Sequence, residues 1–228
     1  MEDVFEYLLI IHQQASDEAR SVKMAQYMRN QYDFLGVTAP IRKELLRPFF
    51  TEYKRQIRPH FRALVKLCWD HKYREMQMTG MDILGKFQKE LGPEDILFME
   101  ELITRKSWWD TVDWLAANPV GYILKENPKL QKTVPDQWMN SDDFWLQRTA
   151  ILFQLKYKDE VDAEMLYRFI KSQKDSKEFF IQKACGWALR QYSKYNPDSV
   201  IDFLQSTPDL PRLTITEGYK DMKRKGIV

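Results

Sequence analysis

The sequence predicts an all-α fold in which pairs of helices stack into a solenoid, an α-α superhelix. Long segments carry apolar residues at positions i, i+3, i+4 and i+7, and nowhere do they sustain the strict alternation of a strand. Corresponding residues also recur every 35 residues, which is the length of a helix-pair repeat. The recurring positions include Gln77, Val112, Gln147 and Gln182. These two observations favour a helical repeat protein over a domain that contains a sheet.

Turn and capping residues indicate where the helices begin. Capping residues precede or open three of the repeated segments. They are Ser107 with Asp110, Ser141 with Asp142, and Asp175 with Glu178. Between these segments, second helices are opened by proline, which fits the first turn of a helix, at Pro93, Pro128 and Pro197. The predicted unit is helix, short turn, helix, and we assign Asp110 to capping.

We expect one domain that spans residues 1–228. Residues 1–60 fit the repeat poorly and are predicted to be atypical N-terminal helices. Residues 61–206 carry the repeats, and 207–228 are predicted to be a C-terminal tail. No linker divides the chain, and the length is sufficient for a substantial core. A monomer is the default expectation for this architecture.

The composition argues against several classes of protein. The N-terminus is acidic where a secretory signal needs positive charge, and no apolar run approaches the ~20 residues of a membrane span. We therefore expect a cytoplasmic protein. The two cysteines, Cys68 and Cys185, form no CxxC pair, and His12, His60 and His71 form no metal-ligand pair. These residues predict no metal site and no serine or cysteine triad.

The charge is distributed unevenly although the net charge is only +2. Residues 20–55 hold eight bases against three acids, and residues 171–194 hold six against two. Two basic zones on either side of a more neutral middle suit a surface that grips a polyanion. Ordinary solvated helix faces are the alternative for either zone.

The 35-residue step also aligns a candidate site. From Asp113 it leads to Arg148 and then to Lys183, and from Trp109 it leads to two phenylalanines. Trp109 and Asp113 share one helix face, because four residues separate them. Stacked helices would place these residues along one concave wall, which Trp187 and Arg190 extend.

An aromatic wall beside one carboxylate suits a positively charged group. Ordinary glycoside hydrolysis needs two carboxyl groups, but one suffices when the leaving group is already cationic, as in a purine alkylated at N3 or N7. Asp113 could then stabilise the positive sugar and orient water, since two charges ~4 Å apart interact by about 4 kcal/mol at a dielectric of 20. Indole faces would add cation–π attraction. We expect Arg148 and Lys183 to bind flanking phosphates.

Each residue also has a structural interpretation. Trp109 and Trp187 could belong to the core, and Asp113 could form only an ion pair between repeats with Arg148. Tyr27 lies among basic residues and could be buried or could face DNA. We treat the remaining tryptophans as packing residues.

Three long motifs resemble the HEAT-like repeat DNA glycosylases of the AlkD type, the DNA alkylation repair enzyme family. The motifs are Ser107-Trp108-Trp109-Asp110-Thr111-Val112-Asp113, the segment from Trp145 to Lys158, and the segment from Ser176 to Arg190. Tyr27-Met28 and Phe34-Leu35-Gly36 extend the likeness over nearly the whole chain. Thr38-Ala39 departs from the family pattern, in which two polar residues often precede the proline.

The resemblance implies an enzyme of base excision repair that hydrolyses the N-glycosidic bond of cationic alkylpurines, such as 3-methyladenine and 7-methylguanine, in double-stranded DNA. It implies no lyase activity and no cofactor. It also implies that Asp113 is the catalytic carboxylate, that Trp109 and Trp187 contact the sugar, and that Arg148 contacts the DNA backbone. The expected DNA contacts are Tyr27, Arg42, Lys43, Lys156, Lys183 and Arg190. The alternatives are a protein-binding scaffold of HEAT repeats and a DNA-binding relative without catalysis.

Overall fold

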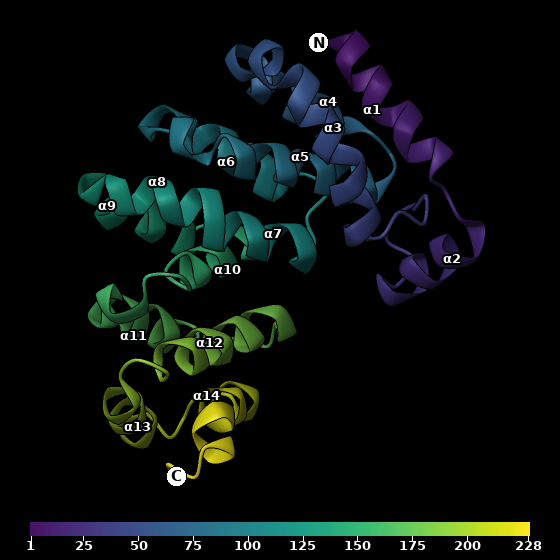
Figure 1. Ribbon diagram of the computed structural model, residues 1–228. Coiled ribbons are helices and arrows are strands. Elements are labelled where there is room, and N and C mark those ends of the chain that lie inside the picture. Colours follow the sequence, from purple (N-terminus) through teal and green to yellow (C-terminus); the bar gives the residue numbers. More distant parts are fainter. The chain divides into compact units, whose positions relative to one another are not determined.

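The computed structural model describes all 228 residues and consists of helices and turns, without a β-strand (Figure 1). The predicted all-α class is confirmed, and its helix pairs are those of an α-α superhelical repeat fold. The chain divides into two compact units, unit 1 (Met1–Glu90) and unit 2 (Leu91–Val228). The prediction of a single domain over residues 1–228 stays a prediction. None of the helices combines the length and apolar character that crossing a membrane requires.

Unit 1 contains five α-helices, of which the fourth and fifth pack closely as a pair. They are α1 (Glu2–Gln14), α2 (Glu18–Tyr27), α3 (Ala39–Ile57), α4 (Phe61–Asp70) and α5 (Arg74–Lys86), with 3-10 turns η1 (Arg58–His60) and η2 (Gln88–Glu90). Helix α2 buries none of its residues. The prediction that residues 1–60 are atypical N-terminal helices stays a prediction.

A buried carboxylate holds the irregular segment between α2 and α3. Glu75 is fully buried on α5 and accepts hydrogen bonds from the backbone N–H groups of Leu35, Gly36 and Val37, at 2.9 to 3.1 Å. Gly36 has φ +85°, and a Cβ there would lie 2.1 Å from the carbonyl oxygen of Asp17. Both its conformation and the close approach of α2 therefore require glycine.

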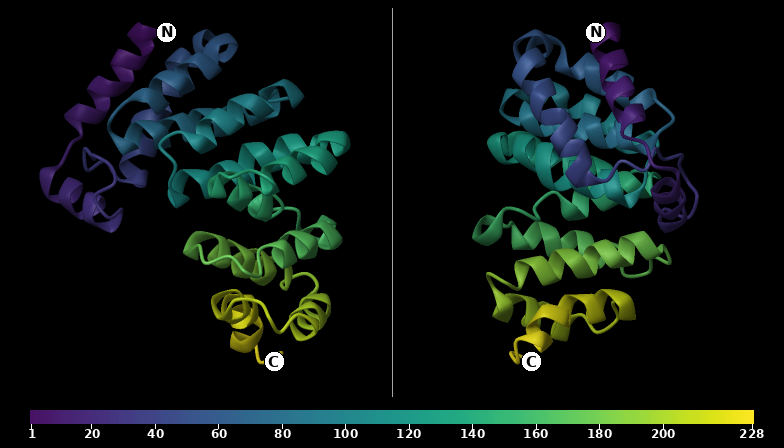
Figure 2. Two further views of the ribbon diagram at one scale, coloured as in Figure 1. Left: turned by 180° about the vertical axis from the view of Figure 1, so that it is seen from behind. Right: turned by 45° about the vertical axis from the view of Figure 1, so that its right-hand side comes forward.

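Unit 2 is a succession of helices in which α7 packs against α10, α10 against α12, and α12 against α14 (Figure 1). The same order from teal to yellow is visible in two further views (Figure 2). The α-helices are α6 (Ile96–Thr104), α7 (Trp109–Leu115), α8 (Gly121–Glu126), α9 (Pro128–Met139), α10 (Phe144–Leu152), α11 (Ala163–Ser172), α12 (Phe179–Tyr192), α13 (Pro197–Ser206) and α14 (Arg212–Arg224). Short turns complete it: η3 (Pro93–Asp95), the π turn η4 (Ala116–Val120) and η5 (Lys158–Glu160).

The 35-residue period appears directly in the helix starts. Helices α5, α7, α10 and α12 begin at Arg74, Trp109, Phe144 and Phe179, each 35 residues after the one before. In three of these helices the glutamine at the recurring position donates its side-chain N–H to the carbonyl six residues earlier and so closes the preceding turn. The donors and acceptors are Gln77 and His71, Gln147 and Ser141, and Gln182 and Ser176, at 2.7 to 2.8 Å.

The helix caps differ in detail from those predicted. Asp143 caps α10 and Glu178 caps α12, each through its side-chain carboxylate. Helix α7 has Trp108 at its N-cap without a side-chain bond. Ser107, predicted as that cap, instead donates its hydroxyl to the Ile103 carbonyl of the preceding helix. Helix α7 therefore begins one residue later than a cap at Ser107 would place it.

The predicted C-terminal tail is a helix. Residues 212–224 form α14, whose inward face buries Thr214, Glu217 and Met222. Contact with α12 is close, because a Cβ at Gly186 would lie only 2.5 Å from the Cβ of Glu217. The helical arrangement therefore continues to Arg224, although this segment contains few apolar residues that would predict a helix.

We expect unit 1 to lose stability in mild acid through His12. This side chain is buried on α1, its Nδ1 bonds to the Leu8 carbonyl at 2.7 Å, and its Nε2 lies 2.9 Å from the Thr79 hydroxyl. Burial lowers the pKa of His12 from its ordinary value of 6.5. The unfolded chain therefore binds the proton first, so stability falls as the pH drops below about 6.5 towards the lowered value. Urea unfolding of the wild type and of His12→Gln between pH 7.5 and 5 measures the contribution of His12 to the free energy of unfolding. An identical pH dependence in both proteins would contradict the prediction.

Candidate functional site

Four of the predicted site residues line one open pocket in unit 2. The pocket has a volume of about 480 Å³, and its walls include Trp109 and Asp113 from α7, Trp187 from α12, and Lys156 from the turn after α10. Neither indole is sealed in the core, since both are only partly buried. The sequence interpretation that placed the two tryptophans in the core does not describe their position.

Helix geometry explains why these side chains meet. Trp109 opens α7, and Asp113 follows one turn later on the same face. Helices α7 and α12 each pack against α10, and Trp187 and Asp113 line the same cavity. The pocket therefore joins two repeats that are not neighbours in sequence.

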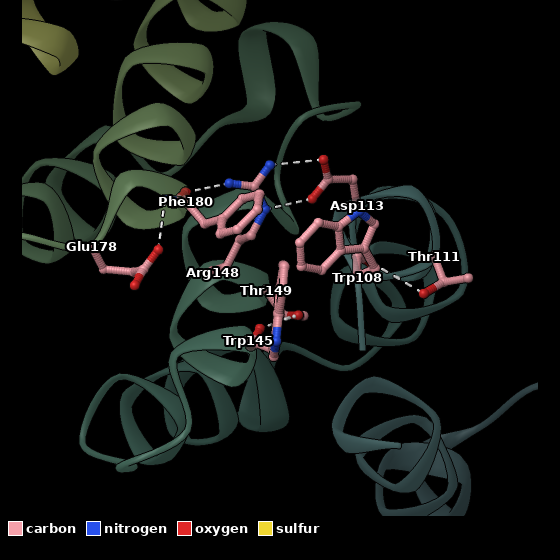
Figure 3. A network of polar contacts seen from close by, with 8 residues as sticks. All are labelled: Trp108, Thr111, Asp113, Trp145, Arg148, Thr149, Glu178 and Phe180. Carbon is pink, nitrogen blue, oxygen red and sulfur yellow. Dashed lines mark hydrogen bonds and ion pairs between the residues drawn. The ribbon is translucent and has the colours of Figure 1, made fainter. Parts of the chain in front are cut away.

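Arg148 of α10 holds the Asp113 carboxylate with a two-pronged contact (Figure 3). Its Nε donates to Oδ1 at 2.7 Å and its Nη2 donates to Oδ2 at 2.8 Å. The remaining Nη1 donates to the backbone carbonyl of Phe180. The Asp113 side chain is 13% exposed and that of Arg148 is 4% exposed, so the pair is mostly dry but reaches the pocket on the aspartate side. The contact fixes the orientation of the carboxylate.

Two opposing effects act on the proton affinity of Asp113. Burial raises its pKa above the ordinary value for an aspartate, and the negative charge of Asp110 acts in the same direction. The hydrogen bonds and positive charge of Arg148 act against them, without reversing the shift. A fully ionised carboxylate accepts about four hydrogen bonds, of which Arg148 takes two. Two acceptor positions therefore remain on a carboxylate that lines the pocket.

Arg148, which we expect to bind a DNA phosphate, is engaged within the protein in this structure. Its guanidinium is buried, and its three nitrogens donate to Asp113 and to the Phe180 carbonyl. The ion pair between repeats, which the sequence left open, is what the structure contains. Because the pair borders the pocket, it also determines how Asp113 faces that pocket.

Lys183 and Arg190 are held by an acid that the sequence analysis did not identify. Glu217 of α14 accepts from the Lys183 ammonium and from the Arg190 guanidinium, each at 2.6 Å. Burial alone would raise the pKa of Glu217, but the bond to Lys183 and the charges of Lys183, Arg190 and Lys220 lower it overall. Neither base lines the pocket, although both belong to α12, which also carries Trp187.

The predicted DNA contacts of unit 1 lie in different environments. Tyr27 is exposed, with 72% of its surface accessible, and Lys43 is exposed on α3. Arg42 is only 7% exposed, and its Nε donates to Asp82 at 2.6 Å. In this conformation Arg42 is an internal ion-pair partner and does not present its charge to a phosphate.

Two further residues belong to the pocket although the sequence analysis assigned them to structure. Asp110 and Trp114 both line it. The spacing of Asp110, three residues before Asp113, was the signal that could have identified it. Most of the other tryptophans are packing residues as expected, and Trp69, Trp138 and Trp145 are buried.

No side-chain cluster in the chain is suited to a metal ion, since no group of three or more His, Cys, Asp or Glu residues comes together. The two cysteines are buried and unpaired. Burial raises the pKa of the Cys185 thiol to about 12 and also raises that of Cys68, so both remain neutral thiols. Neither is suited to be a nucleophile.

Comparison with known protein families identifies the family of this chain. The model of the DNA alkylation repair enzyme family matches residues 13–222, which includes every residue of the pocket. The chain belongs to this family. The resemblance of its three motifs is thereby confirmed.

Comparison with a solved structure supports the fold. This chain is similar to a protein described as a predicted DNA alkylation repair enzyme from Enterococcus faecalis, with 28% sequence identity and a TM-score of 0.83. The similarity covers 90% of this chain and 95% of the other. A search of curated proteins finds no match.

Removal of Arg148 should destabilise the protein more than removal of a surface arginine. Arg148→Met leaves the Asp113 carboxylate buried without a partner, which typically costs about 3–5 kcal/mol. Arg168→Met is the control, because Arg168 makes a similar pair with Asp136 on the exposed surface, where about 0–1 kcal/mol is typical. Urea unfolding measures both free energies, and adding Asp113→Asn to Arg148→Met should restore part of the loss. Equal losses in the free energy of unfolding for Arg148→Met and Arg168→Met would show that the buried pair stabilises the protein no more than the exposed one.

Proposed function

We propose that this protein is a DNA glycosylase that hydrolyses the N-glycosidic bond of cationic N3- and N7-alkylated purines in duplex DNA. The observation that carries the proposal is the Asp113 carboxylate, which Arg148 orients and which lines a pocket together with Trp109 and Trp187. Membership of the DNA alkylation repair enzyme family supports DNA as the substrate.

One oriented carboxylate is sufficient for this reaction. When the bond from C1′ to an alkylated purine breaks, its electron pair neutralises the departing base, and the positive charge moves to the sugar. The base therefore needs no acid to protonate it, in contrast to an ordinary glycosidase substrate. Asp113 would stabilise the positive sugar and orient the water that adds to C1′. Because Arg148 fixes this carboxylate before substrate arrives, little reorganisation is needed during the reaction.

The pocket walls suit the same intermediate. Indole faces attract a cation by roughly 0.5–2 kcal/mol each. Trp109 and Trp187 would contact the sugar from α7 and α12, and Asp110 adds a second negative charge to the pocket. We propose that the enzyme is monofunctional, with water as the nucleophile, and that it acts without metal or cofactor.

Asp113→Asn should abolish most base release, because it removes the charge that stabilises the sugar cation while keeping the size of the side chain. We expect a loss of at least about a hundredfold, the scale seen when one electrostatic stabiliser is removed. The assay measures free 7-methylguanine from a duplex under single-turnover conditions, with the strand intact until alkali is added. Asp136→Asn, at an arginine-paired aspartate on the surface, is the control and should retain activity. Absence of release by the wild type from both 7-methylguanine and 3-methyladenine duplexes would defeat the proposal.

Base release should weaken on the acid side at a higher pH than an ordinary aspartate would dictate. Burial raises the pKa of Asp113, so the carboxylate gains its proton, and loses the charge that the reaction needs, as the pH falls through this raised value. Asp110→Asn removes a like charge and should move the acid limb to lower pH. Single-turnover rates against pH, corrected for spontaneous release, test this. An acid limb that does not move in Asp110→Asn would contradict the electrostatic coupling of the two aspartates.

A further inference from the structure

One wall of the pocket is a π turn that contains a proline. In η4 the N–H of Gly121 donates to the Ala116 carbonyl five residues earlier. The same pattern would require residue 119 to donate to the Trp114 carbonyl, but Pro119 has no N–H. The side-chain amide of Asn118 supplies the missing donor, because its Nδ2 lies 2.7 Å from the Trp114 oxygen. Asn118 thereby supplies the hydrogen bond that is lost from this helix segment at Pro119.

The other end of the same amide holds Lys156. The Oδ1 atom of Asn118 accepts a hydrogen bond from the Lys156 ammonium, which comes from the turn after α10. Because Nδ2 is already committed to a backbone carbonyl, the amide cannot flip without losing both bonds. Both side chains line the pocket that contains Asp113. The ammonium is therefore held at one place on the pocket rim.

The backbone that carries Lys156 is fixed to the same π turn. The hydroxyl of Tyr157 donates to the Gly121 carbonyl at 2.7 Å. A Cβ at Gly121 would lie 2.6 Å from the Phe153 carbonyl oxygen, so glycine permits this close approach. The turn at residues 153–157 is thus docked against η4 on both sides of the lysine.

Lys156 keeps its positive charge uncompensated by its partner. Arg148 and Lys183 are each paired with a carboxylate, Asp113 and Glu217 respectively. Asn118 instead is a neutral acceptor, which orients the ammonium without cancelling its field. An exposed ammonium at the rim of a pocket for a cationic nucleoside would repel the base, but it would attract the phosphate beside it.

We propose that Asn118 is a positioning residue that holds the Lys156 ammonium to bind a DNA phosphate next to the altered nucleotide. The inference rests on the proposed function for the identity of the nucleotide. Binding to undamaged duplex can be measured whether or not base is released, so the two proposals fail separately.

The test is a double-mutant cycle on DNA binding. Lys156→Gln should reduce the slope of log K against log salt by about 0.9, the value for one lost phosphate contact. Asn118→Ala should weaken binding by about threefold to tenfold in the wild-type background, and it should have no further effect on Lys156→Gln. Lys158→Gln, at an exposed lysine two residues further on, is the control for general charge and should change the slope less. Additive effects of Asn118→Ala and Lys156→Gln would overturn the inference.

A second variant separates positioning from folding. Asn118→Ala combined with Pro119→Ala restores a backbone donor at residue 119, so the Trp114 carbonyl regains a partner while Lys156 stays unheld. We expect this double variant to recover the thermal stability lost in Asn118→Ala but to keep its weakened binding. On a 7-methylguanine duplex the defect should appear mainly in KM, with kcat nearly unchanged. Recovery of wild-type binding by the double variant would mean that Asn118 serves the helix alone.

Discussion

The regular length of the repeats is the constraint on which unit 2 depends. Because α7, α10 and α12 begin 35 residues apart, side chains 35 residues apart face each other across neighbouring repeats. Three ion pairs have this separation: Asp113 with Arg148, Lys125 with Glu160, and Lys174 with Asp209. A shift of one residue would rotate a side chain by about 100° around its helix and would separate such a pair. The position of the candidate catalytic carboxylate is therefore a property of the repeat length as well as of one residue.

The three pairs share a geometry but differ in what surrounds them. Lys125–Glu160 and Lys174–Asp209 are exposed, where water screens the charges and the pairs contribute little to stability. The Asp113–Arg148 pair is largely removed from water. Each charge therefore offsets the desolvation cost of burying the other. The burial that makes this pair costly is also what strengthens the field of the carboxylate toward the pocket. One ion pair can thus link two helices in the protein interior and also orient a carboxylate for electrostatic catalysis in the pocket.

The sequence predicted the site residues that follow the regular helix spacing. It missed those whose role depends on the exact end of a helix or on which neighbour a side chain faces. The period placed Trp109, Asp113 and Trp187 on surfaces that do meet, because helix faces follow from spacing alone. It could not distinguish a residue that faces the pocket from one that faces the next helix, and Arg148 belongs to the second kind. Glu217 escaped because it lies 34 residues after Lys183, so the regular step falls on its neighbour. Asp110 was assigned to a cap because the start of α7 was placed near Ser107, and a difference of one residue at a helix end decides such an assignment.

Among the four repeats that begin at α5, α7, α10 and α12, the α7 repeat, which carries Trp109 and Asp113, departs from the pattern in several ways. Where three repeats have a glutamine that closes the preceding turn, this one has the fully buried Val112, which cannot donate a hydrogen bond. The residue at the matching turn position, Lys106, has a left-handed backbone with φ +50°. Helix α7 then begins without a side-chain cap and runs into a π turn around Pro119. The glutamine bond is present in the other three repeats, and a side-chain cap is present in the two that follow, at α10 and α12. Such exceptions are expected where a segment serves a site rather than the stability of the fold. In a fold made of equivalent parts, the irregular part is where a specific activity is to be sought.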